Sequence, residues 1–173
     1  MDEMTRAVSN QDHFEISTLV SAFFRALDER RFDDGWAGAF FTDDLRTTTP
    51  VGAAEGAAAV RQAEEAVGRF AATLHSSSDV VVRAAPGGRT ATVSWNAHMT
   101  HVHLDSTLRA RGTGSNPLFT VGGIYEGTVR RTDSGWRVSH MSVRAVWTTG
   151  EPPVLPEETA TRVAGLNENQ PSG

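Results

Sequence analysis

Apolar residues recur at helical spacing near the start of the chain. They fall at i, i+3, i+4, i+7, i+8 and i+11, and so form one stripe along an amphipathic helix (Ile16, Leu19, Val20, Phe23, Phe24 and Leu27). Two aspartates at the start of residues 33–41 predict a short second helix there. Residues 45–49 predict a short strand closed by Pro50, and the Ala- and Glu-rich residues 56–73 predict a third helix.

The pattern changes to β-branched strands after His75. Residues 79–84 and 90–104 flank a Pro-Gly-Gly-Arg turn and predict a long β-hairpin. A second hairpin is predicted from residues 118–131 and 136–147, around the turn Thr-Asp-Ser-Gly. The polar residues 105–117 between the hairpins predict an exposed loop.

Helices first and long antiparallel strands afterwards predict an α+β fold, in which the helices cover one face of a curved sheet. An antiparallel sheet wrapped around the N-terminal helices would form a cone, and such a cone offers a small-molecule pocket at its wide end. We expect one domain over residues 12–150, preceded by a flexible N-terminus at residues 1–11. The Pro- and Glu-rich residues 151–173 are expected to be partly disordered or to cover the pocket.

Composition narrows the possible partners. The 173 residues carry a net charge of −5, with acidic and basic residues mixed along the chain. Binding to nucleic acid needs a concentrated basic face, so we expect no nucleic-acid partner. The chain has no cysteine and no apolar run near the length of about 20 residues that spans a bilayer. We therefore expect no membrane association and a cytoplasmic location.

Three of the six histidines lie in the segment HMTHVH, residues 98–103. Side chains alternate along a strand, so we expect His101 to face inward, His103 to lie nearer the rim and His98 to lie outside. The inward face is chosen because it is the more apolar one (Trp95, Ala97 and Met99).

A metal site is the competing interpretation of these histidines. It would need three or four converging ligands, and one strand face supplies only His101 and His103. His75 and Asp28 could complete such a set, but an HxH pattern on a strand is weak support. We expect neither a metal nor a cofactor.

The chain resembles the nuclear-transport-factor-2-like (NTF2-like) superfamily, and within it the SnoaL-like group that includes scytalone dehydratase and hexachlorocyclohexane dehydrochlorinase. The resemblance covers about residues 12–150. It is carried by the segments ALDERRFDDGW, AFFTDDL, LHSSSDVVV, GGIYEGTVRRTDSGWRVSH and VWTTGE, in that order. It implies a cone-shaped α+β barrel, nearest to the scytalone-dehydratase-like branch. Because that branch tends to be trimeric, it also implies a homo-oligomer, with a trimer ahead of a dimer.

The resemblance implies a pair of catalytic residues. In the dehydratases and dehydrochlorinases of the group, an Asp at the end of the first helix orients a His that removes a proton from the substrate. The matching residues are Asp28 and His75, and a second His of scytalone dehydratase matches His101. Two tyrosines of that enzyme hold a water on the substrate carbonyl; this chain has Leu27 and Thr49 at the matching positions.

The residue chemistry fits such a role. A neutral imidazole with one nitrogen on a carboxylate has a fixed tautomer and a raised basicity, as a general base near neutral pH requires. If the first hairpin turns on its two glycines, His75 lies across from Thr100 or His101, and a bulge decides which. Tyr125 can donate a hydrogen bond to a substrate oxygen. The pocket is expected to be lined by Phe24, Thr49, Met99, Met141, Val143 and Trp147.

We therefore expect a cofactor-independent lyase, isomerase or cyclase acting on a hydrophobic polyketide-like, steroid-like or aromatic substrate. His75 would take the proton, and His101 and Tyr125 would stabilise or protonate the substrate oxygen. The alternative is a non-catalytic small-molecule-binding or interaction domain on the same fold. The enzyme reading requires Asp28 and His75 to lie within about 2.6–3.2 Å of each other at the bottom of an apolar cavity.

Overall fold

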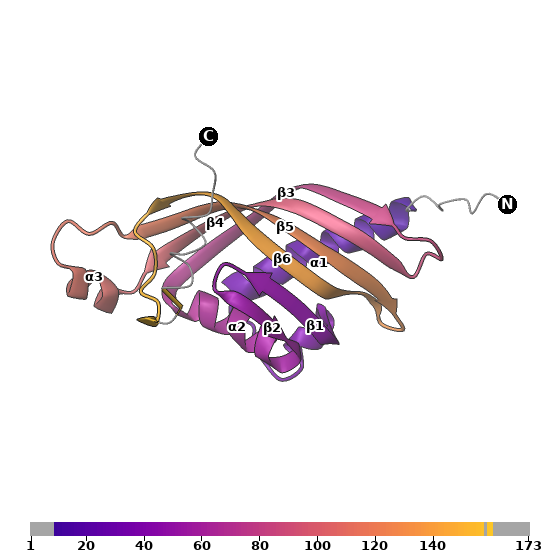
Figure 1. Ribbon diagram of the computed structural model, residues 1–173, viewed down its shortest axis with the longest axis horizontal. Coiled ribbons are helices and arrows are strands. Elements are labelled where there is room, and N and C mark those ends of the chain that lie inside the picture. Colours follow the sequence, from indigo (N-terminus) through magenta and orange to yellow (C-terminus); the bar gives the residue numbers. More distant parts are fainter. Residues whose placement is uncertain (1–8, 158, 161–173) are drawn as a thin grey trace.

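One six-stranded sheet, in the order β2-β1-β6-β5-β4-β3, forms the centre of the molecule (Figure 1). The computed structural model describes residues 9–157, 159 and 160. The long strands come in two antiparallel hairpins, as predicted. The strands are β1 (Phe41–Thr49), β2 (Gly52–Glu55), β3 (Phe70–Ala84), β4 (Thr90–His103), β5 (Leu118–Thr132) and β6 (Gly135–Gly150).

The sheet is mixed and open, whereas the sequence predicted an antiparallel, barrel-like one. Strands β1 and β6 run parallel, and β2 and β3 remain as unpaired edges. No hairpin joins β1 to β6, which lie far apart in the sequence, so the apolar pattern of each strand carries no signal for their relative direction. The curved sheet packed against helices is otherwise the predicted α+β cone.

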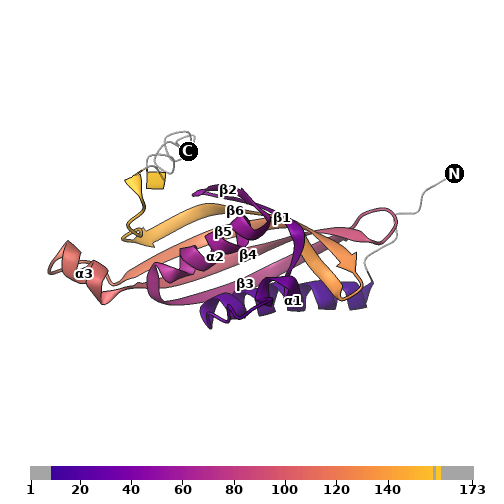
Figure 2. The same ribbon diagram turned by 90° about the horizontal axis from the view of Figure 1, so that it is seen from below.

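Helices α1 (Asn10–Asp28) and α2 (Gly56–Gly68) lie on the same face of the sheet (Figure 2). The side chain of Ser9 caps α1 by accepting a hydrogen bond from the backbone N–H of Asp12. The predicted apolar stripe of α1 is buried against the sheet, with Ile16 and Val20 among its most enclosed residues. Within the described residues, no helix has both the length and the apolar composition needed to cross a membrane.

Several predicted element boundaries were wrong, among them the start of β1, which was expected at residue 45, and the start of β3, which was expected at residue 79. The helix expected at residues 33–41 is a 3-10 turn, η1 (Trp36–Ala39), because Phe41 already pairs with β6 as the first residue of β1. Helix α2 ends at Gly68, where the Arg30 side chain donates to the carbonyls of Val67 and Phe70. The loop expected at residues 105–117 contains a short helix, α3 (Asp105–Arg111).

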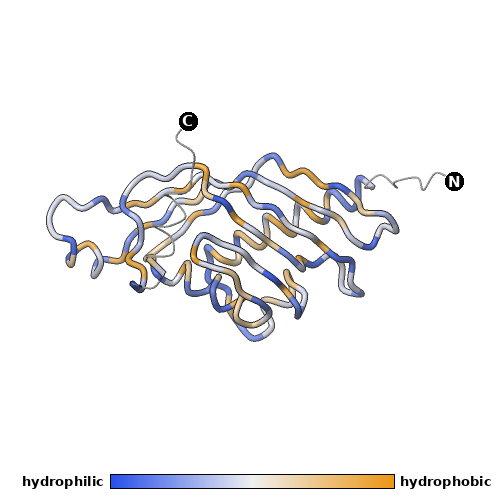
Figure 3. Tube along the Cα trace, in the orientation of Figure 1, coloured by the Kyte–Doolittle hydropathy of each residue, from blue (hydrophilic) through white to orange (hydrophobic). Residues whose placement is uncertain are grey.

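Side chains alternate between the two faces of the long strands, and the predicted inward face of β4 is confirmed. Residues Ala91, Val93, Trp95, Ala97 and Met99 are buried, while the residues between them are partly or fully exposed. Figure 3 shows the same alternation of hydrophobic and hydrophilic positions along the strands. The inner face of the sheet, α1 and part of α2 thus share one core.

The register shifts at two places in each hairpin, and two of these four irregularities bear on the site. In β3, Asp79 and Val80 together oppose Trp95, and Asp79 has a φ of 53°. In β6, Val146 is an extra residue between the pairs Gly123–Ala145 and Gly122–Trp147. Each bulge moves every residue beyond it by one position, and this decides which side chains reach the inner face.

Ile16 provides a test of how strongly α1 packs on the sheet, because its side chain is completely buried. We expect Ile16→Ala to lower the free energy of unfolding by about 2–5 kcal/mol, the usual cost of such a truncation in a core. Phe14→Ala, at a position that is 66% exposed on the same helix, should change it by less than about 0.5 kcal/mol. Urea unfolding curves measure both, and equal losses would contradict this packing.

Candidate functional site

A cavity of about 590 Å³ opens between helix α2, the C-terminal part of α1 and the inner face of the sheet. Its walls are mainly apolar, and its polar side chains are few. Residues beyond β6, including Pro152, Pro153 and Leu155, also line it. A cavity of this size and lining is typical of a site for a hydrophobic small molecule.

Asp28 and His75 form a hydrogen-bonded pair at this cavity. His75 Nδ1 lies 2.5 Å from Asp28 Oδ1, and the two side chains are 4% and 13% exposed, respectively. The same carboxylate accepts hydrogen bonds from the backbone N–H of His75 and from the Thr73 hydroxyl, each at 2.8 Å. Three donors thus hold Asp28, the last residue of α1, against β3.

The surroundings of the pair fix its protonation pattern. Burial alone would raise the pKa of Asp28, but the hydrogen bonds and charge of His75 and the Thr73 hydroxyl outweigh it and hold that pKa below its usual 3.8. An ionised carboxylate only accepts hydrogen bonds, so Nδ1 of His75 carries the hydrogen. In the neutral imidazole, Nε2 is then the unprotonated nitrogen, and His75 is one of the residues that line the cavity.

The bulge in β3 sets the position of His75. His75 pairs with Met99 on β4 instead of Thr100 or His101, and Thr73 pairs with His101. His75 and His101 are therefore diagonal neighbours on the inner face, with ring centroids 5.6 Å apart and planes at 89°. The Phe24 ring lies on the core side of His75, at 5.2 Å between centroids.

His101 is held as a neutral acceptor. Its Nδ1 lies 3.0 Å from the carbonyl oxygen of Phe119, which can only accept, so Nδ1 carries the hydrogen. Burial lowers the pKa of His101 to about 4. Its remaining nitrogen is then a hydrogen-bond acceptor at neutral pH, and not the proton donor that the sequence suggested.

Tyr125 offers a hydroxyl with only a weak partner. It is enclosed between Phe24 and Trp95, with the Trp95 ring stacked at 4.9 Å, and it lines the cavity. Its hydroxyl contacts the Met99 thioether at 3.6 Å, a poor acceptor, so a substrate oxygen would be a better one. Burial raises the pKa of Tyr125 far above 10, so the hydroxyl keeps its proton.

Four of the six expected pocket residues line the cavity, namely Thr49, Met99, Met141 and Val143. Phe24 does not, because it lies behind His75 and Tyr125 in the core. Trp147 does not either, because the Val146 bulge turns it to the outer face. There it is 47% exposed and contacts His98, which lies outside as expected.

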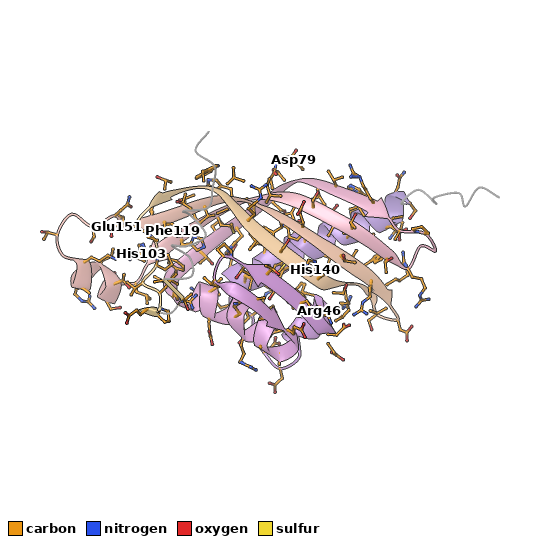
Figure 4. The ribbon with its side chains drawn as sticks, in the orientation of Figure 1. Arg46, Asp79, His103, Phe119, His140 and Glu151 are labelled. Atoms are coloured by element: carbon orange, nitrogen blue, oxygen red, sulfur yellow. The ribbon has the colours of Figure 1, made fainter. Side chains whose placement is uncertain are left out.

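His103 is buried and not near a rim, with 2% exposure. Its Nε2 lies 2.7 Å from the carbonyl oxygen of Glu151, whose carboxylate also pairs with Arg111 at 3.0 Å. Figure 4 shows His103 and Glu151 together near α3, with Phe119 beside them. Across residues 9–157, 159 and 160, no three metal-ligating side chains come together.

The sequence missed several residues of the cavity. Thr73 and the prolines after β6 gave no recognisable signal, because their positions depend on pairing across the sheet. The small residues Ala59, Ala63 and Ala66 of α2 do carry a helical period, and it marks the wall that faces the cavity. Gln62 and Arg69 border the same wall.

A match to a known sequence profile shows which family the chain belongs to. Residues 9–142 match the sequence profile described as a SnoaL-like domain. The chain belongs to the SnoaL-like domain family. This match, with the structural likenesses below, confirms the resemblance to the NTF2-like superfamily. No curated protein sequence gives a significant match to the chain.

Solved structures support the fold of this SnoaL-like domain at low sequence identity. Kfla4162 from Kribbella flavida is 21% identical with a TM-score of 0.70, covering 80% of this chain and 93% of its own. A candidate scytalone dehydratase from Novosphingobium aromaticivorans is 20% identical, with a TM-score of 0.65 and coverage of 83% and 91%. The hexachlorocyclohexane dehydrochlorinase LinA-type3 from Novosphingobium barchaimii is 16% identical, with a TM-score of 0.64 and coverage of 86% and 99%.

The contribution of the Asp28 carboxylate can be measured through its pH dependence. Because its pKa is lowered on folding, the ionised group adds stability above pH 3.8, and this is lost as the pH falls through the folded pKa. We expect Asp28→Asn to lower the free energy of unfolding at pH 7 by about 1–3 kcal/mol, the range for losing hydrogen bonds to a charged group. The difference from wild type should shrink below pH 3.8.

Urea titrations between pH 7 and pH 3 test this expectation. Asp34→Asn is the matched control, since it removes one exposed carboxylate close in sequence to the end of α1. A loss of stability in Asp28→Asn that is independent of pH would contradict the role given to the charge.

Proposed function

We propose that this SnoaL-like domain is a cofactor-independent enzyme that removes a proton from carbon next to a carbonyl or a leaving group. The observation that carries the proposal is the Asp28–His75 pair at 2.5 Å, on the wall of a mainly apolar cavity. This distance is close to the range of about 2.6–3.2 Å expected for a general base oriented by a carboxylate, and so supports the proposal. The reaction class would be that of a lyase, isomerase or cyclase.

His75 acts as the base. Its Nε2 accepts the proton from the substrate carbon, and the electron pair of the broken C–H bond moves toward the carbonyl to give an enolate, or expels the leaving group. Asp28 keeps Nδ1 protonated and stabilises the imidazolium that forms. The proton then returns to another position or leaves with the departing group.

Tyr125 and His101 act on the polar atoms of the substrate. The Tyr125 hydroxyl, on a side chain that is 8% exposed, donates a hydrogen bond to the oxygen on which negative charge develops. His101 accepts a hydrogen bond from a substrate hydroxyl or from a water. Met99, Met141 and Val143 contact the hydrophobic part of the substrate, which fits a polyketide-like, steroid-like or aromatic ring system.

The residues that follow the domain also have a role in the proposed function. We propose that residues 12–150 act as one domain and that residues 151–157 cover the pocket; the remainder of the expected tail lies outside the described residues. In support, Glu151 is tied to His103, Arg111 and the backbone N–H of Asn116, and Pro153 and Leu155 border the cavity. A cytoplasmic location is proposed from the cysteine-free composition.

Proton abstraction can be tested by hydrogen–deuterium exchange at the carbon next to the carbonyl of 2-tetralone, followed by NMR in D₂O. We expect wild-type protein to accelerate the exchange and His75→Ala to reduce that acceleration by about 10²- to 10⁴-fold, the usual contribution of a general base. His98→Ala is the matched control, because His98 lies on the outer face of β4, and it should behave as wild type. Equal exchange by wild type and His75→Ala rejects the base and favours the non-catalytic binding domain.

We also propose a homo-oligomer, with a trimer ahead of a dimer. In support, the outer face of the sheet exposes large apolar side chains, among them Leu74 at 65% and Trp147 at 47%. A second copy of the chain would bury them. The observation does not depend on the chemistry in the pocket.

Light scattering coupled to gel filtration tests the assembly, against a chain mass of 18.6 kDa. We expect wild type at a multiple of that mass and Trp147→Glu shifted toward the monomer, because a charge would be buried unpaired. Phe14→Glu, at a position of α1 that is 66% exposed, is the control and should keep the wild-type mass, because α1 lies on the other face of the sheet. A monomeric wild type at micromolar concentration would contradict the proposal.

A further inference from the structure

Arg69 is the one residue with a full charge among the described residues that line the cavity. It follows α2 directly, between Val67 and Phe70, which also line the cavity. The Phe70 ring lies 4.5 Å from the His101 ring. Arg69 therefore borders the same end of the cavity as the histidines.

The guanidinium of Arg69 has no protein partner within the described part of the chain. Other arginines of this region are satisfied: Arg30 donates to backbone carbonyls and Arg111 pairs with Glu151. The chain carries an excess of acidic residues, 21 against 16 basic ones, yet none of those described is paired with Arg69. Arg69 is half-buried and lines a mainly apolar cavity, and a guanidinium without a protein partner in such a place can bind an anion from outside the chain.

Polar groups border the cavity on both sides. The α2 side has Arg69 and the amide of Gln62, whose oxygen lies 3.5 Å from the Thr47 hydroxyl. The sheet has the acceptor nitrogens of His75 and His101 and the donor hydroxyl of Tyr125. Small alanines between Gln62 and Arg69 leave room for a bound ring (Ala63 and Ala66). A molecule that spans the cavity would place an anionic group toward α2, and its acidic C–H with the oxygen that Tyr125 contacts toward the sheet.

A carboxylate is the group that this arrangement recognises best. A guanidinium offers two parallel N–H donors that match the two oxygens of a carboxylate. The attraction is stronger beside an apolar cavity than in water, because the surroundings screen it less. We propose that Arg69 binds a carboxylate of the substrate, so that the preferred substrates are hydrophobic ring acids and not neutral ring compounds.

This inference rests on the proposed function for the identity of the site, but its test is an equilibrium measurement that needs no reaction. The probes are 2-naphthoate and 2-naphthamide, which share one ring system and differ in charge. Isothermal titration of wild-type protein is expected to give a Kd for 2-naphthoate about tenfold lower, as for one hydrogen-bonded charge pair.

Two variants of Arg69 and one control variant test whether Arg69 causes the preference for the carboxylate. Arg69→Gln should raise the Kd of 2-naphthoate about tenfold and leave that of 2-naphthamide within about twofold, and Arg69→Lys should restore part of the preference. Arg61→Gln removes the same charge from the exposed side of α2 and should bind both probes as wild type does. Thermal unfolding of the three variants checks that each is folded.

The outcomes separate this inference from the proposed function. Equal Kd values for the two probes in wild type, no binding of 2-naphthoate at millimolar concentration, or an unchanged preference in Arg69→Gln overturns the role of Arg69. His75→Ala should keep the preference, because it removes the base and not the cation. A carboxylate preference without any proton exchange would reject the enzyme and leave Arg69 as the anion contact of a binding domain.

Discussion

The carboxylate of Asp28 links helix α1 to strand β3. It ends α1 and accepts hydrogen bonds from the Thr73 hydroxyl and from both the backbone and the ring of His75. These bonds fix the end of the helix on the first long strand, and with it the wall of the cavity. A negative charge at a helix C-terminus is unfavourable for the helix itself, so the donors on β3 must compensate for it. The same contact that anchors the fold also selects the tautomer of the histidine.

The sequence predicted best the features that depend on the residues of a single helix or strand. The alternation along β4 predicted that His101 faces inward and His98 outward, because each strand position needs only its neighbours to set its face; the depth of His103 was not predicted. The stripe of α1 was equally clear. Strand registers and element boundaries could not be predicted in this way, because they follow from contacts between distant segments. Phe41 became a strand residue through pairing with Val138, and α2 stopped where Arg30 donates to the carbonyls of Val67 in α2 and Phe70 in β3.

The misplaced Trp147 illustrates the limit for the site. Alternation assigned it to the pocket, and one extra residue, Val146, moved it to the other face. The composition around residue 146 contains no bulge signal such as a Gly. Arg69 was missed for a different reason: a single arginine after an amphipathic helix looks like an ordinary exposed charge until the helix is placed against a cavity. The match to the SnoaL-like domain does not identify Arg69 as a binding residue either.

Gly122 and Gly123 each leave space for a neighbouring side chain, on opposite faces of the sheet. A side chain on Gly122 would lie 2.1 Å from the Trp147 ring, and one on Gly123 would lie 3.2 Å from the Met99 side chain. Adjacent residues thus leave space for an aromatic ring outside and for a thioether in the cavity. A larger residue at position 122 would dislodge the tryptophan while sparing the ligand site, and one at position 123 would reshape the ligand site while sparing the outer surface. Substitutions at these two neighbouring positions would therefore change the outer face of the sheet and the cavity independently.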